Sequence, residues 1–94
     1  MDDLLRAKRD QIIRIAAAHG AGNLRVFGSA ARGNARPDSD VDLLIDITGE
    51  PSPWFPGGLI SDLEELLGRR VDVATERELH EVVRARVVKE AVPL

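Results

Sequence analysis

Residues 24–45 read LRVFGSAARGNARPDSDVDLLI, and this stretch decides the fold. A short run at 24–27 is broken by Gly28-Ser29, and a second run at 40–47 alternates between charged and apolar residues before it becomes mostly apolar. Alternation with period two and β-branched residues are typical of strands, whereas the Ala-Ala-Arg that follows Gly28-Ser29 favours a short helix. The glycine, asparagine and proline after that helix indicate a loop. The stretch therefore predicts a strand, a short helix, a loop and a second strand.

On the N-terminal side, a single helix is predicted from a cap at Asp2 or Asp3 to about Ala18. Apolar residues recur on one side of it at helical spacing. His19-Gly20 ends this helix, because a histidine suits its last turn and glycine accepts the left-handed cap. The buried side would contain Leu5, Ile12, Ile15, Ala16 and His19. Gly22-Asn23 is then predicted to turn the chain into the strand at 24–27.

On the C-terminal side, residues 48–58 form an irregular connection with three prolines and three glycines. The spacing of leucines and isoleucine predicts a helix over 59–67, ended by Gly68, and then a strand over 70–74. Thr75 and Glu78 have the spacing of a capping box and open a last helix, which Pro93 stops. The buried side of that helix would contain Leu79, Val83, Val87 and Ala91. The predicted fold class is α/β (α+β), with a small mixed sheet of about three strands flanked by helices.

Composition limits the classes of function. The chain has 94 residues, 44% of them hydrophobic and 31% charged, which is typical of one soluble globular domain over residues 1–94. The 13 basic and 16 acidic residues give a net charge of −3, so a duplex nucleic acid is not the expected partner. No signal peptide and no membrane-spanning apolar run are recognisable, and there is no cysteine. The expected compartment is the cytoplasm.

The Gly28-Ser29 pair lies where the first strand meets the short helix. Glycine lets a ligand approach the backbone closely, and the start of a helix offers unpaired N–H groups together with the serine hydroxyl. Such a junction can cradle a phosphate. The alternative is a tight turn in which Ser29 caps the helix.

Asp40 and Asp42 open the second strand. Residues two apart in a strand point to the same face, so both carboxylates share one side while Val41 and Leu43 point to the other. Adjacent carboxylates repel each other, and a divalent cation removes that repulsion. Mg²⁺ is typically held by one or two protein carboxylates together with substrate phosphates. The alternative is an exposed strand start with solvated acidic residues.

Asp72 adds a third carboxylate. It lies between Val71 and Val73 and therefore points away from two residues that favour the core. If its strand neighbours the strand of Asp40 and Asp42, three carboxylates converge beside the Gly28-Ser29 turn. Such a cluster suits two-metal phosphoryl or nucleotidyl transfer.

These residues resemble a known family. Gly28-Ser29, ten intervening residues and Asp40-x-Asp42 are similar to the GS-x10-D-x-D signature of the DNA polymerase β-like nucleotidyltransferases. The fuller stretches GSAARG and SDVDLLI look like its minimal nucleotidyltransferase branch. That branch includes stand-alone antitoxins paired with HEPN-domain toxins, so the resemblance implies the nucleotidyltransferase fold and a HEPN-type partner.

The resemblance also implies a role for each matching position. Gly28 and Ser29 would hold the β- and γ-phosphates of ATP, with Arg32 as a further nucleotide-binding residue. Asp40, Asp42 and Asp72 would be both the catalytic residues and the ligands of two Mg²⁺ ions. The implied reaction transfers AMP from ATP to a hydroxyl, in the antitoxin branch a tyrosine hydroxyl of the partner toxin, and thereby silences that toxin.

Other functions and residues keep alternative interpretations. The chain could be a non-catalytic module that neutralises a partner by binding it, or a nucleotidyltransferase that modifies a small molecule or an RNA end. Trp54 and Phe55, bracketed by prolines, could cover a core edge, stack on a base or dock a partner. We expect solvated or structural positions for the remaining polar candidates, which are Asp38, Asp46, Ser39, His19, His80, Arg84, Arg86 and Lys89.

Overall fold

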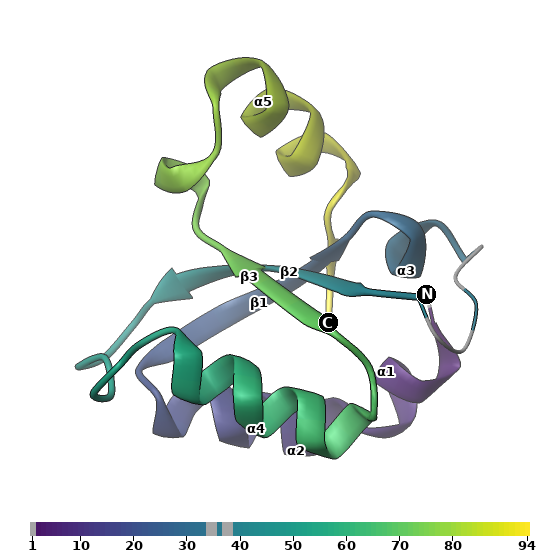
Figure 1. The fold of residues 1–94 in the computed structure, drawn as a ribbon. Coiled ribbons are helices and arrows are strands. Elements are labelled where there is room, and N and C mark those ends of the chain that lie inside the picture. Colours follow the sequence, from purple (N-terminus) through teal and green to yellow (C-terminus); the bar gives the residue numbers. More distant parts are fainter. Residues whose placement is uncertain (1, 34–35, 37–38) are drawn as a thin grey trace.

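The computed structural model describes residues 2–33, 36 and 39–94, and its centre is a mixed sheet of four strands (Figure 1). The strands are β1 (Ala21–Phe27), β2 (Val41–Ile47), β3 (Val71–Ala74) and β4 (Val92–Pro93), in the order β3-β2-β1-β4. β1 is antiparallel to β2 and β4, whereas β2 and β3 are parallel. The predicted fold class is confirmed, with one short strand more than expected.

Three helices cover one face of this sheet: α1 (Asp3–Ala7), α2 (Arg9–Ala18) and α4 (Gly57–Leu67). Figure 1 shows α2 and α4 side by side below the strands, whereas α5 (Glu81–Glu90) stands on the other side. The core between sheet and helices is aliphatic, and its fully buried members include Leu5, Ile12, Val26, Val41, Leu43, Leu59 and Leu63. Within the described ranges, no helix has both the length and the apolar character needed to cross a bilayer.

The first helix was predicted as one element and is two. Lys8 interrupts it with φ −101° and ψ 10°, so α1 ends at Ala7 and α2 begins at Arg9. The predicted cap is correct, because the Asp2 carboxylate accepts the N–H groups of Leu4 and Leu5. Leu5 and Ile12, one on each side of the break, are both completely buried.

β1 is longer than predicted. Gly22-Asn23 does not turn the chain before the strand but lies inside it, where the pairing with β2 shifts its register between Gly22 and Arg25. Asn23 has φ 48°, a conformation that asparagine tolerates better than most residues. A turn signal therefore marks an irregularity within the strand.

The C-terminal segment departs furthest from expectation. The capping box of Thr75 and Glu78 is present, but it opens the short 3-10 turn η1 (Glu76–Glu78), and α5 begins only at Glu81. Within α5 only Val87 is buried, while Val83 is 48% exposed. Pro93 lies in β4 at the sheet edge, where its missing N–H leaves no ladder bond unmade.

Candidate active site

Two strand pairings bring the predicted carboxylates together at the start of β2. Asp42 lies opposite Phe27 in the antiparallel pair with β1 and opposite Asp72 in the parallel pair with β3. Residues in register on neighbouring strands project to the same face. Because Val41 and Leu43 point into the core, Asp42 and Asp72 lie side by side on the opposite face, the side on which α5 stands (Figure 1).

Gly28 connects β1 to the four-residue helix α3 (Ser29–Arg32) directly beside Asp42. Its φ is 72°, in the region that favours glycine. A Cβ atom built on Gly28 would come too close to Asp42 Oδ2, so a side chain there would require the Asp42 carboxylate to move. The Gly28-Ser29 turn and the aspartate pair therefore form one continuous site.

The charge on Asp42 is unfavourable in this setting. Burial raises the pKa of Asp42, and the nearby carboxylates of Asp72 and Asp40 raise it further, while the Arg32 guanidinium opposes them. Asp40 is exposed and immediately precedes β2. All three predicted acidic residues thus contribute to one local field.

Arg32 lies at the end of α3, with its side chain 54% exposed. Its Nη1 forms an ion pair with Glu90 of α5 at 3.6 Å, and its charge is felt at Asp42. Ser29, the first residue of α3, is partly buried. Arg32 is therefore close enough to Asp42 to act on its charge, and Ser29 directly follows the glycine that contacts Asp42.

The donor chemistry of the site fits Mg²⁺. Within the part of the chain that is described, no three histidine, cysteine or acidic side chains are gathered tightly enough to bind a metal on their own. Mg²⁺ does not need such a cage, because it usually combines one or two carboxylates with substrate phosphates and water. The repulsion that raises the pKa of Asp42 is also what a bound cation would relieve.

Two residues beside the site were not recognised as part of it from the sequence. Arg69 is only 7% exposed, and its guanidinium contacts the Asp2 carboxylate and the backbone oxygen of Ser39, each at 2.8 Å. Asp2 was predicted only as a helix cap, and no local pattern links residues 67 positions apart. Ser39 Oγ accepts the N–H of Arg36 at 2.8 Å, a contact that immediately precedes Asp40. Asp38 lies outside the described residues.

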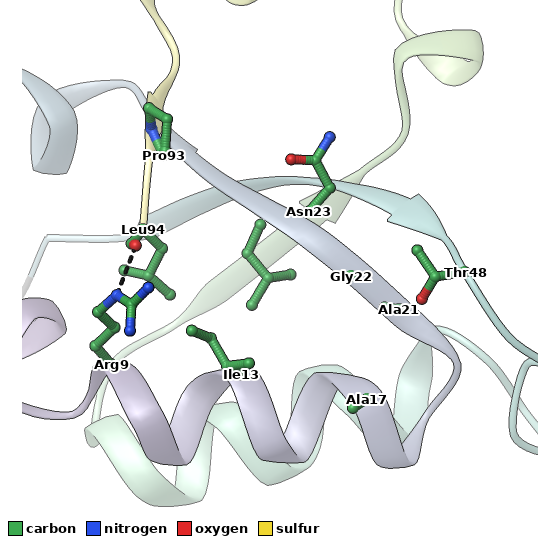
Figure 2. Close-up of a pocket in the computed structure, with 10 residues that line it drawn as sticks. Arg9, Ile13, Ala17, Ala21, Gly22, Asn23, Thr48, Pro93 and Leu94 are labelled. Carbon is green, nitrogen blue, oxygen red and sulfur yellow. Dashed lines mark hydrogen bonds between the residues drawn. The ribbon is translucent and has the colours of Figure 1, made fainter.

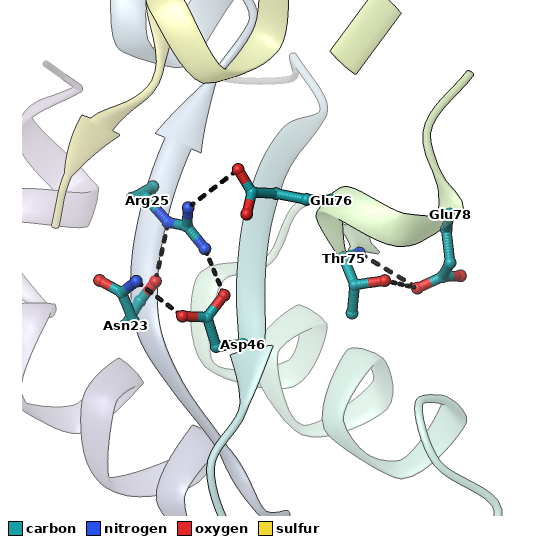
Figure 3. A network of polar contacts seen from close by, with 6 residues as sticks. All are labelled: Asn23, Arg25, Asp46, Thr75, Glu76 and Glu78. Carbon is teal, nitrogen blue, oxygen red and sulfur yellow. Dashed lines mark hydrogen bonds and ion pairs between the residues drawn. The ribbon is translucent and has the colours of Figure 1, made fainter. Parts of the chain in front are cut away.

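A polar network occupies the other end of the same sheet face (Figure 3). Arg25 Nη2 binds Asp46 Oδ1 at 2.8 Å, and Asn23 Nδ2 donates to Asp46 Oδ2 at 2.8 Å. Glu76 of η1 lies 4.0 Å from Arg25 Nη1. Asp46 thus acts as a partner for the arginine on the neighbouring strand and has no place in the aspartate cluster.

A groove of about 370 Å³ lies between α2 and the β1–β4 edge (Figure 2). Arg9, Ile13 and Ala17 line its helix side, and Arg9 Nε donates to the backbone oxygen of Leu94 at 2.8 Å. None of the predicted site residues lines this groove. It is separate from the aspartate cluster.

The two adjacent aromatic residues have different environments. Phe55 is partly buried and packs against the core, whereas Trp54 is 92% exposed with φ 63°. Their connection follows the C-terminal end of β2, while Asp42 lies at its N-terminal end (Figure 1). Phe55 therefore covers a core edge, and Trp54 stands at the end of the sheet away from Gly28.

Comparison with known proteins shows the family to which this chain belongs. Residues 9–94 match the family model of the nucleotidyltransferase domain. Protein adenylyltransferase MntA of Thermococcus cleftensis is 41% identical over 78% of this chain and 74% of its own length. A Methanocaldococcus jannaschii protein provisionally named protein adenylyltransferase MJ0435 is 37% identical over 87% of this chain and 88% of its own length.

Solved structures give the same result. One described provisionally as a minimal nucleotidyltransferase has a TM-score of 0.84 and 46% sequence identity, covering 100% of this chain and 97% of that one. A second, described as a toxin–antitoxin with AMP-PNP, has a TM-score of 0.74 over 89% of this chain and 69% of that one. At 21% identity this second structure supports the fold alone. Because residues 9–94 of this chain match the family model, the chain belongs to the nucleotidyltransferase domain family, in its minimal branch.

Proposed function

We propose that the chain is a Mg²⁺-dependent protein adenylyltransferase that transfers AMP from ATP to a hydroxyl of a partner toxin in the cytoplasm. The observation that carries this proposal is the pairing of Asp42 with Asp72 across β2 and β3, with Gly28 packed directly against Asp42. A half-buried carboxylate next to a second carboxylate is unfavourable in a chain that only has to fold. The same pair of carboxylates can bind the Mg²⁺ that accompanies the triphosphate of a nucleotide substrate.

Each side chain then has a distinct task. We assign the β- and γ-phosphates to the backbone N–H groups of Gly28 and Ser29, because this turn directly adjoins the Asp42 carboxylate. Arg32 turns from Glu90 to the phosphates and balances their charge. Asp72 accepts the proton of the attacking hydroxyl, which forms a bond to the α-phosphorus as the bond to pyrophosphate breaks.

Asp40, Asp42 and Asp72 would hold the two Mg²⁺ ions that the family resemblance implies. Bound there, Mg²⁺ would neutralise triphosphate charge and lower the pKa of the attacking hydroxyl. Asp42, central in the field of the other two, is the residue whose charge most needs a cation.

The partner is inferred from relatives. Proteins with 37% and 41% identity are named as protein adenylyltransferases, and a protein with the same fold was solved as part of a toxin–antitoxin. Together with the signature of the antitoxin branch, these support a HEPN-domain toxin as acceptor and its tyrosine hydroxyl as the modified group. The chain would then act as the antitoxin.

The test uses the protein, Mg²⁺, ATP labelled at the α-phosphate and the candidate toxin encoded by the neighbouring reading frame. Label should pass to the toxin, and Asp42→Asn should reduce the rate about 10³-fold or more, because a metal ligand is lost. Asp10→Asn is the matched control, since Asp10 is an exposed aspartate on α2. Full labelling by Asp42→Asn would contradict the proposal.

Two alternative functions predict different results in related experiments. A chain whose Asp40→Ala and Asp42→Ala variants still bind and neutralise the toxin would be a binding module. Label transferred to a small molecule or an RNA end, and not to protein, would keep the chemistry and change the acceptor.

A further inference from the structure

We propose that Arg69 and Asp2 are positioning residues that hold the two halves of the active site in register. One half is the Gly28-Ser29 turn with α3, and the other is the start of β2 with Asp40 and Asp42. This inference rests on the proposed function only for its catalytic consequence. Its structural part stands on contacts between residues remote from one another in sequence.

Asp2 is attached to the first half. Its backbone N–H donates to the carbonyl oxygen of Ala30 in α3 at 3.1 Å. The two oxygens of its carboxylate have different partners. Oδ1 accepts the N–H groups of Leu4 and Leu5, and Oδ2 accepts from Arg69 Nη1 at 2.8 Å. Asp2 therefore fixes α3 to α1 and offers one oxygen to the arginine.

Arg69 is attached to the second half. Its Nε donates to the backbone oxygen of Ser39 at 2.8 Å, and Ser39 immediately precedes Asp40. The guanidinium fork can bind both Asp2 and Ser39 because its N–H groups diverge within one rigid plane. A lysine ammonium, a point charge on a flexible stem, cannot reproduce that fixed pair of directions.

These contacts form one continuous path between the halves. It runs from the Ala30 carbonyl through Asp2 and Arg69 to the Ser39 carbonyl, and so joins α3 to the residue before Asp40 independently of the chain between them. The Arg69 side chain is 3% exposed and that of Asp2 is 12% exposed, so the path is largely shielded from water. Hydrogen bonds are stronger in such surroundings.

Stability alone is a poor account of this pair. A buried ion pair gains little over apolar residues of similar volume, because both charges lose their hydration. The ion pair differs from an apolar contact because its hydrogen bonds are directional. They fix the positions of the backbone carbonyl groups of Ala30 and Ser39 relative to each other. Catalysis requires a precise distance and orientation between the backbone that binds phosphate and the carboxylates that bind metal.

The structural part is tested by amide hydrogen exchange in Arg69→Lys, which keeps the buried charge beside Asp2. We expect faster exchange in α3 and at Val41, with α2 and α4 unchanged. Arg14→Lys on the exposed side of α2 is the control. Unchanged exchange in both segments, or faster exchange at Val41 without any change in α3, would overturn the proposal.

The catalytic part is tested by binding of a non-hydrolysable ATP analogue with Mg²⁺, measured by calorimetry on protein shown to be folded. Arg69→Lys should weaken binding about tenfold or more. The double variant Asp2→Ser with Arg69→Met, which leaves no unpaired buried charge, should weaken it to a similar extent. Unchanged affinity in both variants would overturn this part.

The two failures can be told apart. If the wild-type protein does not bind the analogue while Arg69→Lys still shows the exchange pattern, the positioning role stands and the proposed function fails. If the wild-type protein binds and Asp42→Asn does not, while Arg69→Lys exchanges like the wild type, the function stands and the positioning role fails.

Discussion

At the scale of single residues, Asp42 faces a conflict between folding and chemistry. It lies in a strand whose neighbouring side chains, Val41 and Leu43, are buried, and it shares its own face with Asp72. Burial and the two nearby carboxylates all oppose its ionisation, which raises its pKa. Residues that reduce the stability of the fold are common in active sites.

Asp42→Asn should therefore stabilise the metal-free protein while abolishing its activity. Because the folded-state pKa is raised, ionised Asp42 destabilises the fold at neutral pH, and this penalty disappears as the pH falls through that pKa. We expect the variant to gain about 0.5–1 kcal/mol in free energy of unfolding at pH 7 and no advantage at acidic pH. Denaturant unfolding in the presence of a chelator measures this difference. A loss of stability at pH 7 would contradict the explanation.

The two glycines Gly28 and Gly57 make a matched pair. Gly28→Ala would place a methyl group against Asp42 Oδ2 in a left-handed backbone conformation, so we expect a loss of about 1–3 kcal/mol together with weakened nucleotide binding. Gly57 begins α4, and a Cβ there meets nothing within 4 Å. Gly57→Ala should gain about 0.5–1 kcal/mol, as alanine favours the helix. Thermal or chemical unfolding of both variants tests the contrast, and equal effects would refute it.

At the scale of elements, the bounds of helices and strands could be predicted from local signals, whereas the pairing of strands could not. The helix ended by Gly68 and the strand that begins after Asp40 were predicted to within two residues, because capping glycines and apolar periodicity act over a few positions. The signature that resembles a known family indicated the turn at Gly28 as well. The sequence could not predict that β2 and β3 are neighbours, because strand order is set by tertiary packing. The meeting of Asp42 and Asp72 depends on that neighbourhood.

The same limit explains what was missed. The Arg69–Asp2 contact and β4 both join segments far apart in the chain, and neither has a local pattern. The Thr75–Glu78 capping box has its normal local geometry, yet the backbone returns to an extended conformation at Leu79 and His80 before α5. A capping signal specifies the start of a helical turn and not its length.

Helix α5 gives a prediction at this scale. It is attached through one buried side chain, Val87, while Val82 and Val83 are 71% and 48% exposed. Val87→Ala should cost about 1–3 kcal/mol through the lost burial and the cavity left behind. Val82→Ala should stay within about 0.5 kcal/mol of the wild type, as is usual for exposed positions. Chemical denaturation distinguishes these values, and a large effect at Val82 would mean that this face of α5 is covered in solution.

At the scale of the whole molecule, the sheet separates two ends with different character. The end with Gly28 and Asp42 carries the paired carboxylates and the Gly28-Ser29 turn, to which we assign phosphate binding. The other end carries the connection of residues 48–56, which is held in place because His19 binds Ser52 Oγ at 2.6 Å and Asp62 Oδ2 at 2.8 Å. Trp54 projects from this braced connection.

The position of Trp54 predicts that nucleotide binding will leave its fluorescence unchanged. Residues 43–47 of β2 separate Asp42 from this connection by roughly 15–20 Å, beyond the reach of a base stacked on the indole. The chain has a single tryptophan, so its emission reports this end alone. Titration of Mg²⁺ and ATP, excited where adenine does not absorb, should give a flat signal, and an added quencher should reach the indole as easily as before. Quenching or a shift of the emission on ATP binding would mean that the connection bearing Trp54 takes part in the nucleotide site, and the separation of the two ends would have to be abandoned.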